Sequence, residues 1–433
     1  DYGAENVEST FRSCYAGEEE HGSVRLPRSA GGKGRREADE ANKPAEVEAI
    51  EAFLFSQAEF RHNVITHHCE IRWTEEAGFL PLTDRDVNTL WGRMNKTVGR
   101  VYLTDIYNVI HSEFVPLFNP FQSYFDHLPS WDGVSDPIGD LADTVHVKSD
   151  QAEFRDYFRK WFVGILPALL DDTVVNHEIL VLIGEQGLYK TTWFNFLLPP
   201  ELRCYFYTKT NSDRLNKDDL FSLTEFALIC FEELDGMRPA ELNQLKAMVT
   251  MPYVNERAAY GRNKERHPHI ASFCGTGNNV QFLTDPTGNR RWLPFEVSQI
   301  RDPHLHAIPY ELVYSQAYAL WKSGFCHWFS QEEIRKLNMH NSRFEVPNLE
   351  EDLIRTHFRK PFEGEAGIFV TAADILEQIS SCLRYPLSPN KIGRIMAGLE
   401  FESIRYKGKR GYIAVKKTGE DIDRERRSGA LGL

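Results

Sequence analysis

The sequence lacks the patterns that indicate disulfide bonds, a structural metal site or a membrane-spanning segment. Cysteines are scattered and none forms a Cys-x-x-Cys pair, which indicates reduced thiols in a cytoplasmic protein. They are Cys14, Cys69, Cys204, Cys230, Cys274, Cys326 and Cys382. We do not expect the run His67-His68-Cys69 to chelate a metal, because neighbouring strand residues point to opposite faces. No apolar run is as long as a membrane span and no signal peptide is evident, so no membrane partner is expected.

The chain also has no excess of positive charge. Its 50 Lys and Arg residues face 63 Asp and Glu residues, for a formal net charge of −13. Binding to nucleic acid must therefore depend on a local basic feature rather than on a global field. With 433 residues, 42% of them hydrophobic, the chain is long enough for about two to four domains. It begins at Asp1 rather than Met, which is compatible with a fragment of a longer protein.

The residue patterns divide the chain into five predicted segments. Residues 1–45 are Gly-rich and charged, as in a disordered linker or tail. Residues 46–150 predict a mainly helical N-terminal domain, and residues 151–330 an α/β domain with three layers and a mainly parallel sheet. In residues 331–417, two short helices and then a basic hairpin predict a winged-helix-like domain, followed by a flexible tail at 418–433.

The stretch Ile179–Thr192 is the centre of the predicted α/β domain. Five apolar residues, Ile179–Ile183, predict a buried strand, which is followed by a glycine-containing turn and then by Lys-Thr-Thr. This order is typical of a phosphate-binding loop, in which backbone N–H groups and a Lys hold a polyphosphate and a hydroxyl binds Mg²⁺. We therefore predict that ATP and Mg²⁺ bind here. The candidate ATP-binding residues are Gly184, Glu185, Gln186, Gly187, Leu188, Tyr189, Lys190, Thr191 and Thr192.

The loop departs from the usual motif at one position. Tyr189 occupies the place of the second glycine of G-x-x-x-x-G-K-[ST], and Gly187 lies two residues earlier. The alternative interpretation is a glycine turn between a strand and a helix with an incidental Lys.

Two acidic residues follow the next strongly apolar stretch. The run Phe226–Phe231 leads directly into Glu232 and Glu233. We predict that Glu232, with Thr191, is on the metal side of the site and that Glu233 polarises the attacking water. Asp235 is a second candidate for the latter role. A solvated acidic turn is the alternative.

Polar residues after a further strand complete the predicted site. Asn278 follows Ser272–Gly277 and is our first choice, with Asn279 the second, for a residue that contacts the γ-phosphate or the water. A Gly-Asn turn is the alternative. Arg290 and Arg291 precede the apolar run Trp292–Val297, where a ring ATPase would place an arginine finger for the neighbouring subunit. We favour Arg291, with a solvated or ion-paired role as the alternative.

A basic segment lies between the acidic pair and Asn278. Basic groups beside an aromatic ring suit contact with single-stranded DNA of any sequence. The alternative is an exposed charged hairpin. The candidate DNA-binding residues are Arg257, Tyr260, Arg262, Lys264, Arg266 and His267.

In order along the chain, these motifs resemble the virulence-associated protein E family of phages and mobile elements. The resemblance spans roughly residues 50–300 and includes Asn-Pro-Phe, Leu-Pro-Ser-Trp-Asp-Gly and Thr-Gly-Asn-Arg-Arg-Trp-Leu-Pro, besides the phosphate loop and the acidic pair. It implies a P-loop NTPase of the AAA+-like kind, akin to superfamily III helicases and to the helicase half of primase-helicases. It also implies a ring, with a hexamer expected, and a primase domain or subunit as partner.

The sequence thus predicts an ATP-dependent DNA helicase or translocase of a mobile element that moves along single-stranded DNA. Two alternatives remain open. One is an ATP-dependent switch that loads or remodels a partner without unwinding DNA, and the other is a DNA-binding replication initiator without enzymatic activity.

Overall fold

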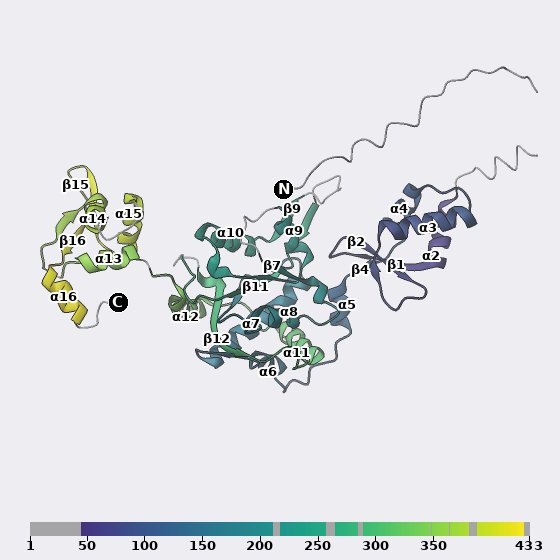
Figure 1. The fold of residues 1–433 in the computed structure, drawn as a ribbon, viewed down its shortest axis with the longest axis horizontal. Coiled ribbons are helices and arrows are strands. Elements are labelled where there is room, and N and C mark those ends of the chain that lie inside the picture. Colours follow the sequence, from purple (N-terminus) through teal and green to yellow (C-terminus); the bar gives the residue numbers. More distant parts are fainter. Residues whose placement is uncertain are drawn as a thin grey trace, which may run out of the picture. The chain divides into compact units, whose positions relative to one another are not determined.

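The computed structural model describes residues 45–210, 217–256, 265–284, 289–347, 349–362, 364–380 and 388–427. The chain divides into two compact units between Phe118 and Asn119. Each unit has its own core, and Figure 1 shows the elements of both.

The first unit is a small α/β structure rather than a mainly helical domain. Its four strands have the order β3-β2-β1-β4, in which β1 and β2 form an antiparallel hairpin and β4 runs parallel to β1. Side chains such as Ile50, Leu90 and Ile106 from the three helices share one core with Ile71 of the sheet. The elements are α2 (Val47–Gln57), β1 (Ala58–Asn63), β2 (His68–Trp73), β3 (Leu80–Pro81), α3 (Asp84–Thr97), α4 (Leu103–Ile110) and β4 (Leu117–Phe118).

The second unit is built on a six-stranded sheet with the order β5-β12-β6-β11-β8-β7. Five of these strands are parallel, and only β5 runs antiparallel to its neighbour β12. The predicted strand Ile179–Ile183 is confirmed as β6, and all five of its residues are buried. Burial of every side chain is expected where a parallel strand is covered on both faces.

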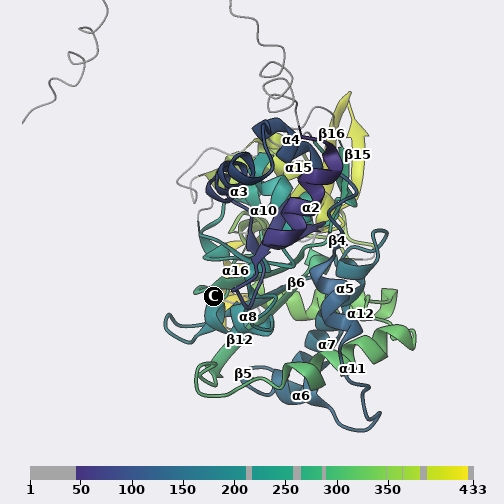
Figure 2. The same cartoon turned by 90° about the vertical axis from the view of Figure 1, so that its right-hand side faces the viewer.

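Helices cover both faces of this sheet, which gives the predicted three layers. Ile179 and Val181 share a core with Leu242 and Leu245 of α10. On the other face, Phe295 of β12 packs edge-to-face against Phe154 of α7, with ring centroids 5.0 Å apart. Figures 1 and 2 show the sheet between α10 on one side and α7 and α8 on the other.

The α/β part of the second unit contains sixteen of the described helices and strands. In chain order they are α5 (Pro120–Asp126), α6 (Pro137–Ala142), β5 (Val145–Val147), α7 (Gln151–Leu170), β6 (Ile179–Ile183), α8 (Lys190–Leu197), β7 (Phe206–Lys209), α9 (Lys217–Glu225), β8 (Leu228–Phe231), α10 (Pro239–Val249), β9 (Tyr253–Glu256), β10 (Glu265–Pro268), β11 (Ser272–Gly277), β12 (Trp292–Ile300), α11 (Tyr310–Lys322) and α12 (Gln331–Asn341).

Both limits of this α/β structure differ from the predicted 151 and 330. Strand β5 pairs with β12, so the residues before 151 contribute to the sheet. Beyond 330, α12 is held to the start of β12, because Asn341 Nδ2 donates to the carbonyl of Trp292 at 3.0 Å and His340 Nε2 lies 2.7 Å from the carbonyl of Pro294. These contacts join residues that are far apart in sequence, which a local pattern does not show.

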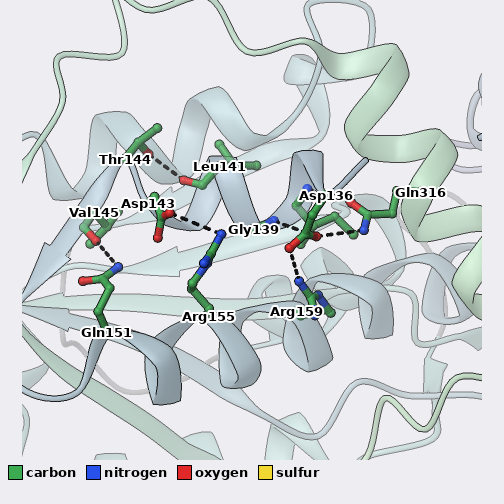
Figure 3. A network of polar contacts seen from close by, with 11 residues as sticks. Asp136, Gly139, Leu141, Asp143, Thr144, Val145, Gln151, Arg155, Arg159 and Gln316 are labelled. Atoms are coloured by element: carbon green, nitrogen blue, oxygen red, sulfur yellow. Dashed lines mark hydrogen bonds and ion pairs between the residues drawn. The ribbon is translucent and has the colours of Figure 1, made fainter. Parts of the chain in front are cut away.

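A polar network fixes the start of this unit to α7 and α11 (Figure 3). Asp136 caps α6 by accepting the Gly139 N–H at 3.2 Å, and its carboxylate also accepts from Arg159 at 2.5 Å and from Gln316 at 2.9 Å. Burial alone would raise the pKa of Asp136, but these hydrogen bonds and the Arg159 charge lower the pKa overall. One carboxylate thus ties three helices together.

We expect Asp136→Asn to lower the free energy of unfolding by about 1–2 kcal/mol at neutral pH, because the network is partly solvated. Since the pKa is lower in the folded state, this contribution is present above the unfolded-state pKa of about 4 and is lost as the pH falls through the folded-state pKa. Urea unfolding across acidic and neutral pH measures the difference. Asp140→Asn, at an exposed position of the same helix, is the matched control and should be neutral.

The C-terminal part contains the two helices and the hairpin that the sequence predicted. Strand β16 pairs antiparallel with β14 and with β15, and α14 and α15 pack on this small sheet through Ile375, Ile392 and Met396. Ser388 caps α15 by accepting the Lys391 N–H at 3.3 Å. The elements are α13 (Leu349–His357), β13 (Phe358–Arg359), β14 (Ile368–Val370), α14 (Ala372–Ser380), α15 (Pro389–Gly398), β15 (Ser403–Tyr406), β16 (Lys409–Lys416) and α16 (Gly419–Arg427).

Candidate active site

The loop between β6 and α8 begins at a glycine that has no room for a side chain. A Cβ on Gly184 would lie 2.9 Å from the carbonyl oxygen of Val297, and the Gly184 N–H donates to the carbonyl of Gly277 at 3.1 Å. Gly187 adopts a φ of 89°, a conformation that favours glycine. Glu185 and Gln186 are exposed between them, whereas Leu188 is half-buried against Gly184. The loop therefore turns sharply from the strand into the helix.

Tyr189 takes the backbone conformation for which the motif normally has glycine. It lies at the N-cap of α8 with φ 60° and ψ 17°, in the left-handed region, and its side chain is 42% exposed. A non-glycine residue pays about 1 kcal/mol or more in this region. The residue that departs from the motif therefore adds backbone strain to the loop.

We predict that Tyr189→Gly raises the midpoint of thermal unfolding or leaves it unchanged, because the strain of about 1 kcal/mol offsets the loss of a half-exposed ring. Tyr189→Val should lower it, since β-branched residues tolerate the left-handed region worst. Differential scanning calorimetry of both variants measures the contrast. A Tyr189→Gly variant less stable than Tyr189→Val would show that the ring, not the backbone, determines this position.

Lys190 places a buried positive charge at the start of α8. Its side chain is only 8% exposed, and its Nζ donates to the carbonyls of Gly184 at 2.6 Å and Glu185 at 2.8 Å. The Asn278 Oδ1 lies 3.3 Å from the same nitrogen. Burial lowers the pKa of Lys190, and the charge of Asp235 partly opposes this shift. Lys190 is thus a desolvated cation whose hydrogen-bond partners, among the described residues, are neutral oxygens.

The next residue of α8 contacts the predicted metal-side acid. The Thr191 hydroxyl donates to Glu232 Oε1 at 2.7 Å, so the end of β8 lies beside the start of α8. Thr192 is half-buried on the same helix. Among the described residues, no group of three or more His, Cys, Asp or Glu side chains could hold a metal ion by itself. A hydroxyl and one carboxylate suit Mg²⁺, which usually keeps several other oxygen ligands from water and substrate.

Glu233 is held in a strained conformation at the end of β8. Its backbone has φ 54° and ψ 45°, and its side chain is exposed. Left-handed conformations of non-glycine residues cluster at functional sites, where the surrounding structure imposes them. The left-handed backbone lies at Glu233 itself, directly after Glu232, where the chain leaves β8.

The sequence suggested Asp235 as a second candidate to polarise the attacking water, but in the structure Asp235 binds backbone groups. Its carboxylate accepts the backbone N–H groups of Asn278 and Asn279, both at 3.1 Å. Gly277 makes this approach possible, because a Cβ there would lie 3.1 Å from Asp235 Oδ1. Asp235 therefore joins the acidic turn to the end of β11 and fixes the position of Asn278, a role that the sequence did not reveal.

The two arginines lie at the other end of the sheet from this cluster. In the parallel register Trp292 pairs with Ile179 and Glu296 with Ile183, so Arg290 and Arg291 are at the end of β6 remote from the loop. Arg290 is exposed and Arg291 half-buried. Burial lowers the pKa of Arg291, as does the Arg290 charge, whereas Glu178 raises it. Within one chain, the structure does not bring these arginines to Lys190.

The predicted DNA-binding hairpin lies only partly within the described residues. Strands β9 and β10 pair antiparallel as predicted, and the Arg266 guanidinium lies 3.7 Å from the ring centroid of Tyr253. His267 is only 7% exposed, so its ring is not on the hairpin surface, and the prediction that it contacts DNA does not fit the structure. Alternation along a strand explains this difference between neighbours. Arg257, Tyr260, Arg262 and Lys264 lie outside the described residues.

The sequence of this region matches a known family. Residues 126–346 match the model of the virulence-associated protein E-like domain, which is just over half of the chain. The chain belongs to this family. The matched range of the virulence-associated protein E-like domain contains the loop, the acidic turn, Asn278 and both arginines. It also contains the Asp136 network, which joins α6 to α7 and α11, and α12, which Asn341 joins to β12.

The solved structures that the chain is similar to have low sequence identity to this member of the family. The apo C-terminal region of NrS-1 (305-718) has 11% identity and a TM-score of 0.46, over 86% of this chain and 99% of that one. An active helicase, SCCmec type IV Cch, has 11% identity and a TM-score of 0.38, over 87% of this chain and 95% of that one. No curated protein matches the chain.

Proposed function

We propose that this chain is an ATP-dependent motor on single-stranded DNA, a helicase or translocase that serves replication of a phage or mobile element. The observation that carries the proposal is the convergence of Lys190, the Thr191–Glu232 pair and Asn278 at the carboxyl ends of three neighbouring strands. In parallel α/β sheets, ligands bind at this edge. The resemblance to superfamily III helicases and membership of the virulence-associated protein E-like family support the same assignment.

The residues of this edge fit ATP with Mg²⁺ in a P-loop site. Lys190 offers a desolvated ammonium group, which would be worth more against a phosphate than the same charge in water. Thr191 and Glu232 would hold the metal. When bound, Mg²⁺ neutralises negative charge on the transferred phosphate.

Two further residues would act on the water. Glu233 orients it with an exposed carboxylate, and Asn278 contacts it or the γ-phosphate with a side chain whose backbone Asp235 holds in place. Both roles depend on position, since phosphoryl transfer is catalysed mainly by orientation and electrostatics.

The position of Arg290 and Arg291 supports an assembly of several subunits. They are separated from the loop by the length of β6, about 15 Å at the rise of a strand, and by the buried sheet. An arginine that serves an ATP site would therefore have to serve that of a neighbouring subunit. We propose a homo-oligomeric ring, a hexamer in the family resemblance, in which Arg291 completes the neighbour's site.

This arrangement predicts rescue between two inactive variants. Arg291→Ala subunits should bind ATP normally but hydrolyse it about 10²-fold or more slowly, because the missing charge acts on the transition state. Mixed with Lys190→Ala subunits, they should regain activity, since some interfaces then combine an intact loop with an intact arginine. Turnover is measured across mixing ratios, with oligomers checked by light scattering. Intact mixed oligomers without any rescue would contradict the proposed role in trans.

Single-stranded DNA is the proposed partner of the β9–β10 hairpin, in which Arg266 offers a cation stacked on Tyr253. A primase domain or subunit is a further proposed partner, from the resemblance alone.

A strand-displacement assay on a forked substrate tests the motor. Displacement that requires ATP supports it, whereas ATP hydrolysis without displacement would favour the switch or loader.

A further inference from the structure

One segment of the C-terminal part, residues 388–417, concentrates positive charge in an otherwise acidic protein. Residues 388–417 contain only two acidic residues, Glu400 and Glu402, in a chain of net charge −13. Glu400 is already paired with Lys360, at 3.1 Å. The basic residues of the segment are Lys391, Arg394, Arg405, Lys407, Lys409, Arg410, Lys416 and Lys417. The positive charge is thus confined to one segment. Because the chain as a whole is acidic, only such a local basic feature could bind nucleic acid.

The hairpin of β15 and β16 places like charges opposite each other. Arg405 pairs directly with Arg410 across the two strands, and both side chains are exposed. Arg410 Nε donates to the neutral Ser403 hydroxyl at 3.1 Å, and in the described part of the chain neither arginine has an ion pair with a carboxylate. Like charges directly opposite destabilise a hairpin. The fold gains nothing from this pair, so it points to a polyanionic ligand.

Helix α15 lies on the same side of the hairpin as the two arginines. Side chains of one strand face alternate directions, so Arg410 and Tyr412 share a face of β16. The Tyr412 hydroxyl donates to the carbonyl of Gly393 in α15 at 3.1 Å, which shows that this face is turned toward the helix. Figure 1 shows α15 beside the hairpin. Arg394 is exposed on α15, and neither the helix nor the two strands contain a carboxylate.

The turn of the hairpin extends the same basic surface. Lys407 and Gly408 form a two-residue turn with φ of 47° and 78°. Tyr406 is 53% exposed, and Lys407 Nζ lies 5.3 Å from its ring centroid. Lys409 is within electrostatic reach of Asp374, so we leave it out of the set. The set, called the wing surface here, is Arg394, Arg405, Lys407 and Arg410.

We propose that the wing surface is a second nucleic-acid site, which binds duplex DNA independently of ATP. A helix beside a two-stranded hairpin is the shape that the major groove and its flanking phosphates accept. A single strand would need successive aromatic platforms, and the exposed aromatic residue of this hairpin, Tyr406, lies on the other face of β15 from Arg405. The order of a helix, two short strands, two helices and a hairpin resembles that of a winged helix, so the proposal gives a function to this part of the chain. It does not rest on the proposed motor.

The test measures binding of a short fluorescent DNA duplex to the full chain, without nucleotide, at several salt concentrations. Each phosphate contact contributes about −0.9 to the slope of log K against log salt, so Arg405→Ala with Arg410→Ala should flatten the slope by about 2 units. Extrapolated from 1 M salt, this is a loss of roughly fiftyfold in affinity at 0.1 M. The variant with both Arg405→Lys and Arg410→Lys keeps the two charges and should bind the duplex with most of the wild-type affinity.

Controls separate binding from folding and from charge in general. Lys322→Ala with Lys336→Ala removes two exposed charges from α11 and α12 and should leave the slope unchanged. The unfolding temperature of the arginine-to-alanine variant should be unchanged or higher, because the like-charge pair is removed. An unchanged slope in that variant would overturn the proposal, and so would equal binding of polyglutamate or equal loss of binding to the single strand. Since no ATP is present, an inactive ATP site leaves this test unaffected.

Discussion

Lys190→Ala is expected to reduce ATP hydrolysis by about 10²–10³-fold or more and to weaken ATP binding, because a desolvated charge aimed at a phosphate is worth several kcal/mol. In the structure the Lys190 ammonium is buried between two carbonyl oxygens, with the Asn278 amide oxygen 3.3 Å away. Steady-state phosphate release and binding of a fluorescent ATP analogue measure the two effects separately.

Two further variants show whether the effect is catalytic. Lys190→Met keeps the buried stem but removes the charge, and it should be as inactive as Lys190→Ala while its free energy of unfolding stays within about 1 kcal/mol of the wild type. Lys322→Ala removes an exposed Lys of α11 and should keep full activity. Hydrolysis by Lys190→Met at the wild-type rate would show that this Lys does not serve ATP.

Glu233→Gln is expected to bind ATP with near wild-type affinity but to hydrolyse it about 10²–10⁴-fold more slowly, the range of a positioned acid–base group. Glutamine keeps the shape and the strained backbone position of Glu233 but cannot polarise water as a carboxylate does. Single-turnover kinetics with equilibrium binding resolve the two steps.

The neighbouring acid provides the matched comparison. Glu232 accepts the Thr191 hydroxyl at 2.7 Å, so Glu232→Gln should instead weaken the Mg²⁺-dependent part of ATP binding. If Glu233→Gln reduced binding and Glu232→Gln reduced only hydrolysis, the two roles would be exchanged. Equal hydrolysis by wild type and Glu233→Gln would remove Glu233 from the site.

Features encoded by a few adjacent residues could be predicted from the sequence. The five apolar residues of β6, the turn at Gly184 and the helix from Lys190 are local patterns, and the structure confirms them. The hairpin around Lys407 and Gly408 is equally local, because a two-residue turn between alternating strands fixes its register. The strands and helices that carry the candidate site could therefore largely be predicted from the sequence.

Features that depend on distant residues could not be predicted. Asp235 meets the backbone of Asn278 only because β8 and β11 are neighbours in the sheet. Strand β5 has three residues, too few for a periodic pattern, and is recognised only by its pairing with β12. The N-terminal sheet was missed for a different reason. Strands β1 and β2 are neighbours in the chain, but their turn places His67, which is not a glycine, in the left-handed conformation, and the sequence did not indicate this.

The most direct test of the central claim is ATP hydrolysis by the intact chain with and without single-stranded DNA. We predict Mg²⁺-dependent hydrolysis that single-stranded DNA stimulates several-fold and that Lys190→Ala abolishes in both conditions. Tight binding of DNA by a chain that neither binds nor hydrolyses ATP would contradict the account, and would leave a DNA-binding initiator as the function of this protein.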